Sequence, residues 1–253
     1  MRIEIINTGT ELLLGSTLNT HQQWLCRQLA ARGLTVARQV TVADTGPAIE
    51  QAVGESLGRS DLLITTGGLG PTSDDLTRER IAAVLHLELR EDPAVVEHIR
   101  AFFAARNRPM PERTRVQAQI PQAAVVLPNR FGTAPGLALR VPPGRFRPAA
   151  GDAWLIMLPG PPRELHPMFM EQVVPLLERV FPTREPYECR VLRTTGLGES
   201  LVEDRIGEPL ASLVAEGLEI GYCAHVGSVD VRLSACGAKA ALLVQSAENI
   251  VRP

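Results

Sequence analysis

The sequence predicts an α/β protein with a mostly parallel sheet covered by helices, followed by a small α+β domain. In the first half of the chain, short apolar segments typical of buried strands alternate with segments of helical periodicity. Two successive strand-helix-strand crossovers require parallel strands, because the chain must return to the same edge before each new strand. Beyond residue 187 the order changes to a strand, helices and then paired strands, which indicates a separate unit.

Composition excludes several classes of protein. The chain has 253 residues, of which 45% are hydrophobic and 21% charged, a balance that supports a large buried core. The formal net charge of -2 shows no basic excess, so we expect no nucleic-acid partner. No apolar run approaches the roughly 20 residues needed to cross a bilayer, and we expect no membrane association. Four scattered cysteines, without a CxxC pair, fit a reducing compartment and predict a cytoplasmic protein.

The first domain is predicted to span residues 1–181. Strands are expected at 3–7, 34–42 and 61–66, with helices at 18–32 and 45–57 between them. A helix should begin near Asp74 and run towards His86, and Asp92 and Pro93 should start another that continues to residue 106. Further strands are expected at 124–127, 137–141 and 154–158, with a surface hairpin loop at 142–152 and a closing helix at 162–180.

The second domain is predicted to span residues 187–253. It offers a strand at 188–194, two helices at 199–206 and 208–215, strands at 218–223 and 228–235, and a helix at 238–251. No closing strand follows that last helix, so we expect this domain to be shortened. A unit of this size is marginally stable by itself.

A glycine-rich loop at residues 65–75 is the leading candidate for chemistry. It follows a strand and opens a helix, a context in which backbone N-H groups can surround a phosphate. No lysine follows the glycines, and the GxGxxG spacing is absent, so it is neither a P-loop nor a dinucleotide fingerprint. Asp74 and Asp75 are adjacent carboxylates that could share a divalent ion with substrate phosphates. Alternatively, Thr72 and Asp75 form a capping box that only starts the helix.

Polar residues follow other predicted parallel strands, whose carboxyl ends should meet along one edge of the sheet. Glu11 and Asp44 could each be a further metal ligand or a base for water, or simply a cap or a solvated acid. The residues expected to bind the phosphates or the substrate are Thr8, Gly9, Thr10, Thr66, Gly67, Gly68, Gly70, Thr72, Ser73, Gly160, Pro162 and Glu164.

Four motifs in order resemble the amino-terminal region of the CinA family. They are Thr8 to Leu13 with Gly15 and Asn19, Thr65 to Thr72 with Asp74 and Asp75, Gly132 to Gly136, and Leu158 to Glu164. Residues 196–200 resemble, more weakly, the start of the KH-like domain that follows in that family. The resemblance implies a three-layer α/β/α sandwich similar to the molybdopterin-binding fold of MogA and MoaB proteins. It does not extend to the carboxyl-terminal domain that deamidates nicotinamide mononucleotide, so we expect no deamidase activity.

The resemblance also implies a reaction. CinA-type proteins hydrolyse the pyrophosphate of ADP-ribose to AMP and ribose 5-phosphate with a divalent ion such as Mg²⁺, Mn²⁺ or Co²⁺, and Asp74 and Asp75 are the expected metal ligands here. With Glu11 and Asp44 they form the predicted catalytic set. The alternatives are a molybdopterin-binding or adenylyl-transfer protein and a nucleotide-binding module without turnover. We expect a homodimer or another homo-oligomer, with a nucleotide-like small molecule as substrate.

Overall fold

The computed structural model describes residues 1–144, 146–147, 151–182 and 185–252. It divides the chain into two compact units. The first comprises Met1–Arg27 and Thr35–Pro182, and the second comprises Gln28–Leu34 and Thr183–Pro253. The predicted hairpin loop at 142–152 lies partly outside the described residues.

The first unit is built on a six-stranded sheet of order β2-β1-β3-β8-β7-β6. Strands β2, β1, β3 and β8 run parallel, whereas β7 is antiparallel to both of its neighbours. The mostly parallel sheet that the sequence predicts is therefore confirmed. The strands are β1 (Ile3–Thr8), β2 (Val36–Val42), β3 (Leu62–Thr66), β6 (Val125–Leu127), β7 (Gly136–Val141) and β8 (Ala153–Leu158).

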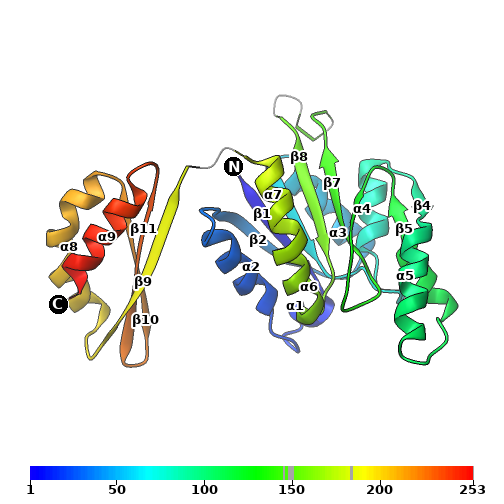
Figure 1. Cartoon of the computed structure of the whole chain (residues 1–253), viewed down its shortest axis with the longest axis horizontal. Coiled ribbons are helices and arrows are strands. Elements are labelled where there is room, and N and C mark those ends of the chain that lie inside the picture. Colours follow the sequence, from blue (N-terminus) through cyan, green and yellow to red (C-terminus); the bar gives the residue numbers. More distant parts are fainter. Residues whose placement is uncertain (145, 148–150, 183–184, 253) are drawn as a thin grey trace. The chain divides into compact units, whose positions relative to one another are not determined.

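Helices cover both faces of this sheet (Figure 1). On one face, α3, α4 and α5 contribute apolar residues to a core cluster that also contains the alternate strand residues Ile6, Leu63 and Leu155. On the other, α2 lies beside α6, where the Trp24 ring stacks on His166 at 3.9 Å between centroids. The helices are α2 (Thr20–Ala30), α3 (Gly46–Leu57), α4 (Thr77–Leu85), α5 (Pro93–Ala104), α6 (Pro162–Met168) and α7 (Val174–Val180).

Several boundaries differ from prediction for local reasons. The expected single helix at 162–180 contains a π-helical turn, η2 (Phe169–Val173), just before Pro175, which has no N-H for the regular helical bond. The sequence patterns also missed four short elements, because such short segments carry too little periodicity to be detected. These are α1 (Thr10–Leu13), β4 (Leu89–Glu91), the 3-10 helix η1 (Glu112–Ala118) and β5 (Gln119–Pro121).

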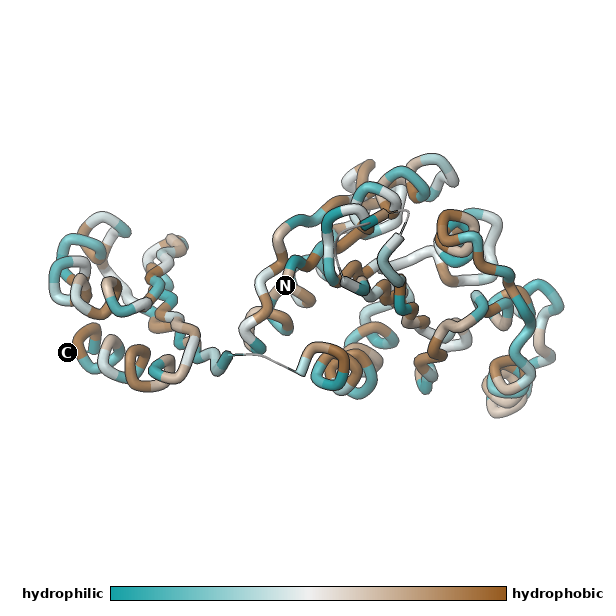
Figure 2. Tube along the Cα trace, turned by 90° about the horizontal axis from the view of Figure 1, so that it is seen from above, coloured by the Kyte–Doolittle hydropathy of each residue, from teal (hydrophilic) through white to brown (hydrophobic). Residues whose placement is uncertain are grey.

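The second unit has the order strand, helix, strand, strand, helix. Its antiparallel sheet has the order β10-β11-β9. Instead of two predicted helices there is one, because Val202, Ile206 and Leu210 form a continuous buried stripe across Pro209. In Figure 2 hydrophobic and hydrophilic residues alternate along the helices, as expected of helices with one buried side. The elements are β9 (Tyr187–Thr195), α8 (Glu199–Ala215), β10 (Leu218–His225), β11 (Ser228–Cys236) and α9 (Ala240–Val251).

Candidate functional site

The strand register brings the predicted loops to one edge of the first sheet. Asn7 pairs with Thr66, and Thr66 with Leu158, so β1, β3 and β8 end side by side. Because β7 is antiparallel to β8, the loop 132–135 that precedes β7 reaches the same edge. Ligands bind at this carboxyl edge in open parallel sheets.

The glycine loop turns sharply where it leaves β3. Gly67 and Gly68 have φ angles of 92° and 67°, a region that side chains with a β-carbon rarely adopt. Residues of β1 and α4 hold the loop in place. The Thr8 hydroxyl donates to the Thr66 carbonyl at 3.1 Å and lies 3.2 Å from the hydroxyl of Thr77. The backbone N-H of Thr77 donates to the Gly68 carbonyl at 3.1 Å. These contacts fix the course of the loop.

A cavity of about 310 Å³ lies between the glycine loop and the segment that follows β8. Gly68, Leu69, Gly70, Pro71 and Asp75 form one wall, and Pro159, Gly160, Pro161 and Glu164 form the opposite one. Gln117, Thr133 and Ala134 complete the lining. Four segments far apart in the sequence thus share one cavity.

Asp75 and Asp74 have different environments. Asp75 lines this cavity and a second one of about 270 Å³ beside α4, whereas Asp74 lines neither. One carboxylate oxygen of Asp75 accepts from the backbone N-H of Thr72 at 2.9 Å and from its hydroxyl. Hydrogen bonding with Thr72 and the charge of Arg113 lower the pKa of Asp74. Of these two carboxylates, Asp75 is the one that lines both cavities.

The Thr72–Asp75 pair closes a turn before the helix begins. The helix α4 starts at Thr77, not near Asp74 as predicted, and its N-cap is Leu76 without a side-chain bond. The reciprocal bond expected of a capping box therefore does not cap α4 directly. The backbone N-H of Thr77, at the first residue of α4, donates to the carbonyl of Gly68 rather than to a capping side chain.

The described residues form no closed metal cage, so any divalent ion here would depend on a few carboxylates together with water or a ligand. Among the described residues no cluster of three or more His, Cys, Asp or Glu side chains could hold a metal. Magnesium commonly binds through one or two carboxylates, with water and substrate phosphates completing its shell. Asp75 fits that role from its position on both cavities, and Asp74 is the adjacent carboxylate.

Glu11 and Asp44 lie at the same edge but outside both cavities. Asp44 accepts from the backbone N-H of Thr10 at 2.8 Å, and its own N-H donates to the Thr10 hydroxyl at 3.2 Å. This pair of bonds ties the end of β2 to the start of α1. Glu11 is exposed in α1 and lies against Gly9, where a β-carbon would approach its carboxylate to 2.6 Å.

Glu164 is the buried carboxyl group of the cavity. It accepts a hydrogen bond from the Asn129 side chain at 2.8 Å. Burial raises the pKa of Glu164, although the bond from Asn129 acts in the opposite direction. A carboxyl group in a cleft whose pKa is shifted by burial is a candidate for proton transfer or ligand binding.

The remaining predicted residues line the two cavities or lie beside them. Thr72 and Ser73 line the second cavity, Gly160 lines the first, and Pro162 begins α6. The ring of His21 hydrogen-bonds the Gly160 carbonyl, and burial lowers the pKa of His21.

Sequence reasoning missed four residues of this site, namely Arg78, Arg113, Gln117 and Asn129. Arg113 donates to the Pro71 carbonyl at 3.1 Å, and Gln117 donates to the Leu69 carbonyl at 3.4 Å, so both brace the glycine loop. Arg78, the residue after Thr77, is fully buried. Burial lowers the pKa of Arg78, whereas the negative charges of Glu79 and Asp75 act to raise it. A polar residue in a predicted helix or loop carries no sequence signal of such burial.

Comparisons with known proteins agree with this architecture. The family described as a probable molybdopterin binding domain matches residues 4–179, and the damage-inducible protein CinA KH domain matches residues 189–252. A CinA-like protein of Akkermansia muciniphila is 45% identical over 234 residues, covering 92% of this chain and 54% of that protein. A CinA-like protein of Deinococcus deserti is 41% identical over 232 residues, with the same two coverages. The chain thus spans about half the length of these relatives.

A solved structure supports the assignment of the first unit. The crystal structure of the protein CinA from Thermoplasma acidophilum has a TM-score of 0.59 and 29% identity, and it covers 69% of this chain and 97% of that one. Among the described residues, no helix is both long and apolar enough to span a membrane. The chain belongs to the CinA family, with a probable molybdopterin binding domain followed by a CinA KH domain.

Proposed function

We propose that the first unit binds the pyrophosphate of ADP-ribose and hydrolyses it to AMP and ribose 5-phosphate with a divalent ion. The observation that carries this proposal is the cavity walled by the glycine loop, Asp75 and Glu164. Backbone N-H groups in such a loop suit a phosphate, and the neighbouring carboxylate suits a hard cation bound to the same phosphates.

The reaction requires water to attack one phosphorus while the bridging P-O bond breaks. The water gives up a proton, and the departing phosphate keeps the bonding electron pair. A divalent ion, when bound, would offset the charge of both phosphate groups. Asp74 and Asp75 are the residues we propose to hold it, and Glu11 or Asp44 is proposed to orient the water.

Each proposed carboxylate has a different supporting observation. The bonds between Thr72 and Asp75 hold that carboxylate at the cavity, which limits the reorganisation needed to bind an ion. The two hydrogen bonds between Asp44 and Thr10, one accepted by the Asp44 carboxylate and one donated by its backbone N-H, hold Asp44 at the edge where the loops meet. Glu11 has the freer side chain of the two candidates for water because it is exposed.

A second candidate function is binding or adenylylation of molybdopterin, supported by the description of the family that matches residues 4–179. Both reactions use a phosphate group at the glycine loop, so the loop alone does not distinguish them. A nucleotide-binding module without turnover is the third candidate, and it predicts thermal stabilisation by ADP-ribose without product.

Incubation of the protein with ADP-ribose and Mg²⁺, Mn²⁺ or Co²⁺, followed by chromatography for AMP and ribose 5-phosphate, tests the proposal. We expect turnover that a chelator abolishes and that the double variant Asp74→Asn/Asp75→Asn lacks. Retained turnover in a folded double variant would show that these carboxylates are not required. Tight binding of the pterin without cleavage of ADP-ribose would favour the second candidate.

A further inference from the structure

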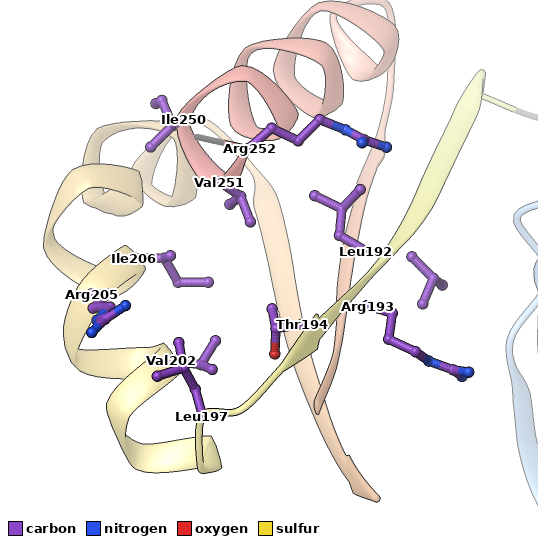
Figure 3. Close-up of a pocket in the computed structure, with 11 residues that line it drawn as sticks. Leu192, Arg193, Thr194, Leu197, Val202, Arg205, Ile206, Ile250, Val251 and Arg252 are labelled. Carbon is purple, nitrogen blue, oxygen red and sulfur yellow. The ribbon is translucent and has the colours of Figure 1, made fainter. Parts of the chain in front are cut away.

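A cavity of about 560 Å³ lies within the second unit, between β9, the first half of α8 and the end of α9 (Figure 3). We call it the β9 groove. Its lining is mostly apolar, with Leu192, Val202, Ile206 and Val251 at its centre. The other residues that line it are Val191, Arg193, Thr194, Leu197, Arg205, Ile250 and Arg252.

The backbone edge of β9 forms one side of this groove. Successive residues of a strand point to opposite faces, yet the four consecutive residues 191–194 all line the groove. In the three-stranded sheet β9 is an edge strand that pairs with β11 alone. Its other edge therefore presents backbone N-H and C=O groups to whatever enters the groove, as at sites where a strand is added to a sheet.

Exposed apolar side chains border this edge. Val191, in the middle of β9, is 58% exposed, and Ile250 at the end of α9 is 44% exposed. A strand edge that pairs with no other strand and lies beside exposed apolar side chains favours association with another strand.

We propose that β9 of a second copy of this chain pairs antiparallel with β9 about a two-fold axis at Val191, closing both grooves. Val191 is the central residue of Tyr187–Thr195, so this register pairs the whole strand with its copy. The result is a continuous six-stranded sheet of order β10-β11-β9-β9-β11-β10. The contact is isologous, as expected of a two-fold dimer.

This register also matches the charges. It places Glu188 of the second copy opposite Thr194, which lines the groove together with Arg205. Glu188 and Thr194 lie on the helix-covered face of the sheet, the face on which Arg190 pairs with Glu248 of α9. Strand alternation puts residues 188, 190, 192 and 194 on that one face. Glu188 of one copy thus approaches Arg205 of the other.

Arg205 is the cation of the groove that has no acidic partner. Arg193 pairs with Asp230 at 2.7 Å, and Arg252 pairs with Glu248 at 2.7 Å. Among the described residues Arg205 makes no ion pair or hydrogen bond. The dimer supplies its partner, and the register sets no two like charges directly opposite one another, since Arg190 faces Leu192 and Arg193 faces Cys189.

Analytical ultracentrifugation of the full chain over a range of concentrations tests the dimer. We expect a reversible monomer–dimer equilibrium. Val191→Pro should raise the dissociation constant by at least about tenfold, because proline removes a backbone donor and obstructs strand pairing. Val226→Lys, at the exposed turn between β10 and β11, is the matched control and should leave the equilibrium unchanged.

Charge reversal separates this contact from a loss of folding. Glu188→Arg and Arg205→Glu should each weaken the dimer, and the double variant should restore it, because the ion pair is re-formed with reversed polarity. A chain that is monomeric at every concentration would overturn the proposal. So would a dimer that neither Val191→Pro nor the single charge reversals weaken, including one that forms through the first unit.

Discussion

The carbonyl oxygen of Thr8 occupies the place that a side chain on Gly67 would need. A β-carbon on Gly67 would lie 2.7 Å from that oxygen, closer than real β-carbons approach a neighbouring atom. The end of β1 and the start of the glycine loop are thus in contact through backbone atoms. The close approach of the two loops, which places both at the candidate site, depends on the absence of a side chain at this position.

Gly67→Ala should therefore destabilise the first unit and distort the cavity. Its φ of 92° and the contact with Thr8 together should cost about 2 kcal/mol or more in the free energy of unfolding. Gly54→Ala in α3 is the matched control, since a β-carbon there would meet Phe146 at an ordinary 3.9 Å. Alanine inside a helix should stabilise it by about 0.5–1 kcal/mol. Urea denaturation of both variants measures the difference, and equal effects would contradict this account of the loop.

Asp75→Asn and Asp74→Asn should differ in their effect on turnover. Asp75 lines both cavities, and its loss should reduce the metal-dependent cleavage of ADP-ribose by at least about a hundredfold. Asp74 lines neither cavity, so the single change should have the smaller effect and be partly offset by a higher concentration of metal ion. Initial rates at several metal concentrations make the comparison. A larger loss from Asp74→Asn would assign the principal ligand to that residue instead.

Glu164→Gln should remove a dependence of stability on pH. Since burial raises the pKa of Glu164, the folded state holds its proton to a higher pH than the unfolded state does. The folded state is thus favoured below the ordinary pKa of 4.5, and stability declines as pH rises through the raised value. Glutamine keeps an acceptor for Asn129 but does not titrate, so the variant should gain stability relative to the native chain as pH rises. Denaturation across this pH range tests the sign.

Asp230→Asn should change the acid stability of the second unit in the opposite direction. Hydrogen bonding to Arg193 lowers the pKa of Asp230 to about 2. A lowered pKa stabilises the folded state above the ordinary value of 3.8, and this stabilisation is lost as pH falls through about 2. The variant should be less stable than the native chain at neutral pH and approach it in acid. A constant difference across that range would show that the titration of Asp230 does not contribute.

The order of the main strands and helices was predictable because each has a strong local pattern. The segment Asp92-Pro93 shows this well: the carboxylate of Asp92 accepts from the backbone N-H groups of Ala94 and Val95, as its sequence indicates. The short 3-10 helix η1 lacks such a pattern and was not predicted. The position of Gln117 in η1 and its contact with the glycine loop were therefore not predicted either. The π-helical turn before Pro175 and the uninterrupted helix across Pro209 show that the helix can accommodate a proline in different ways, which the sequence alone does not indicate.

The sequence by itself determined the fold class and the family, and it singled out the loop at residues 65–75, because ordered motifs and hydrophobic periodicity are local properties. The tertiary structure decided where each candidate carboxylate lies. Asp75 lines the cavity, Asp44 hydrogen-bonds with Thr10, and Glu164 is buried beside Asn129. Only the fold could decide these points, since hydrogen-bond partners and burial arise from segments that meet across the sheet and are distant along the chain.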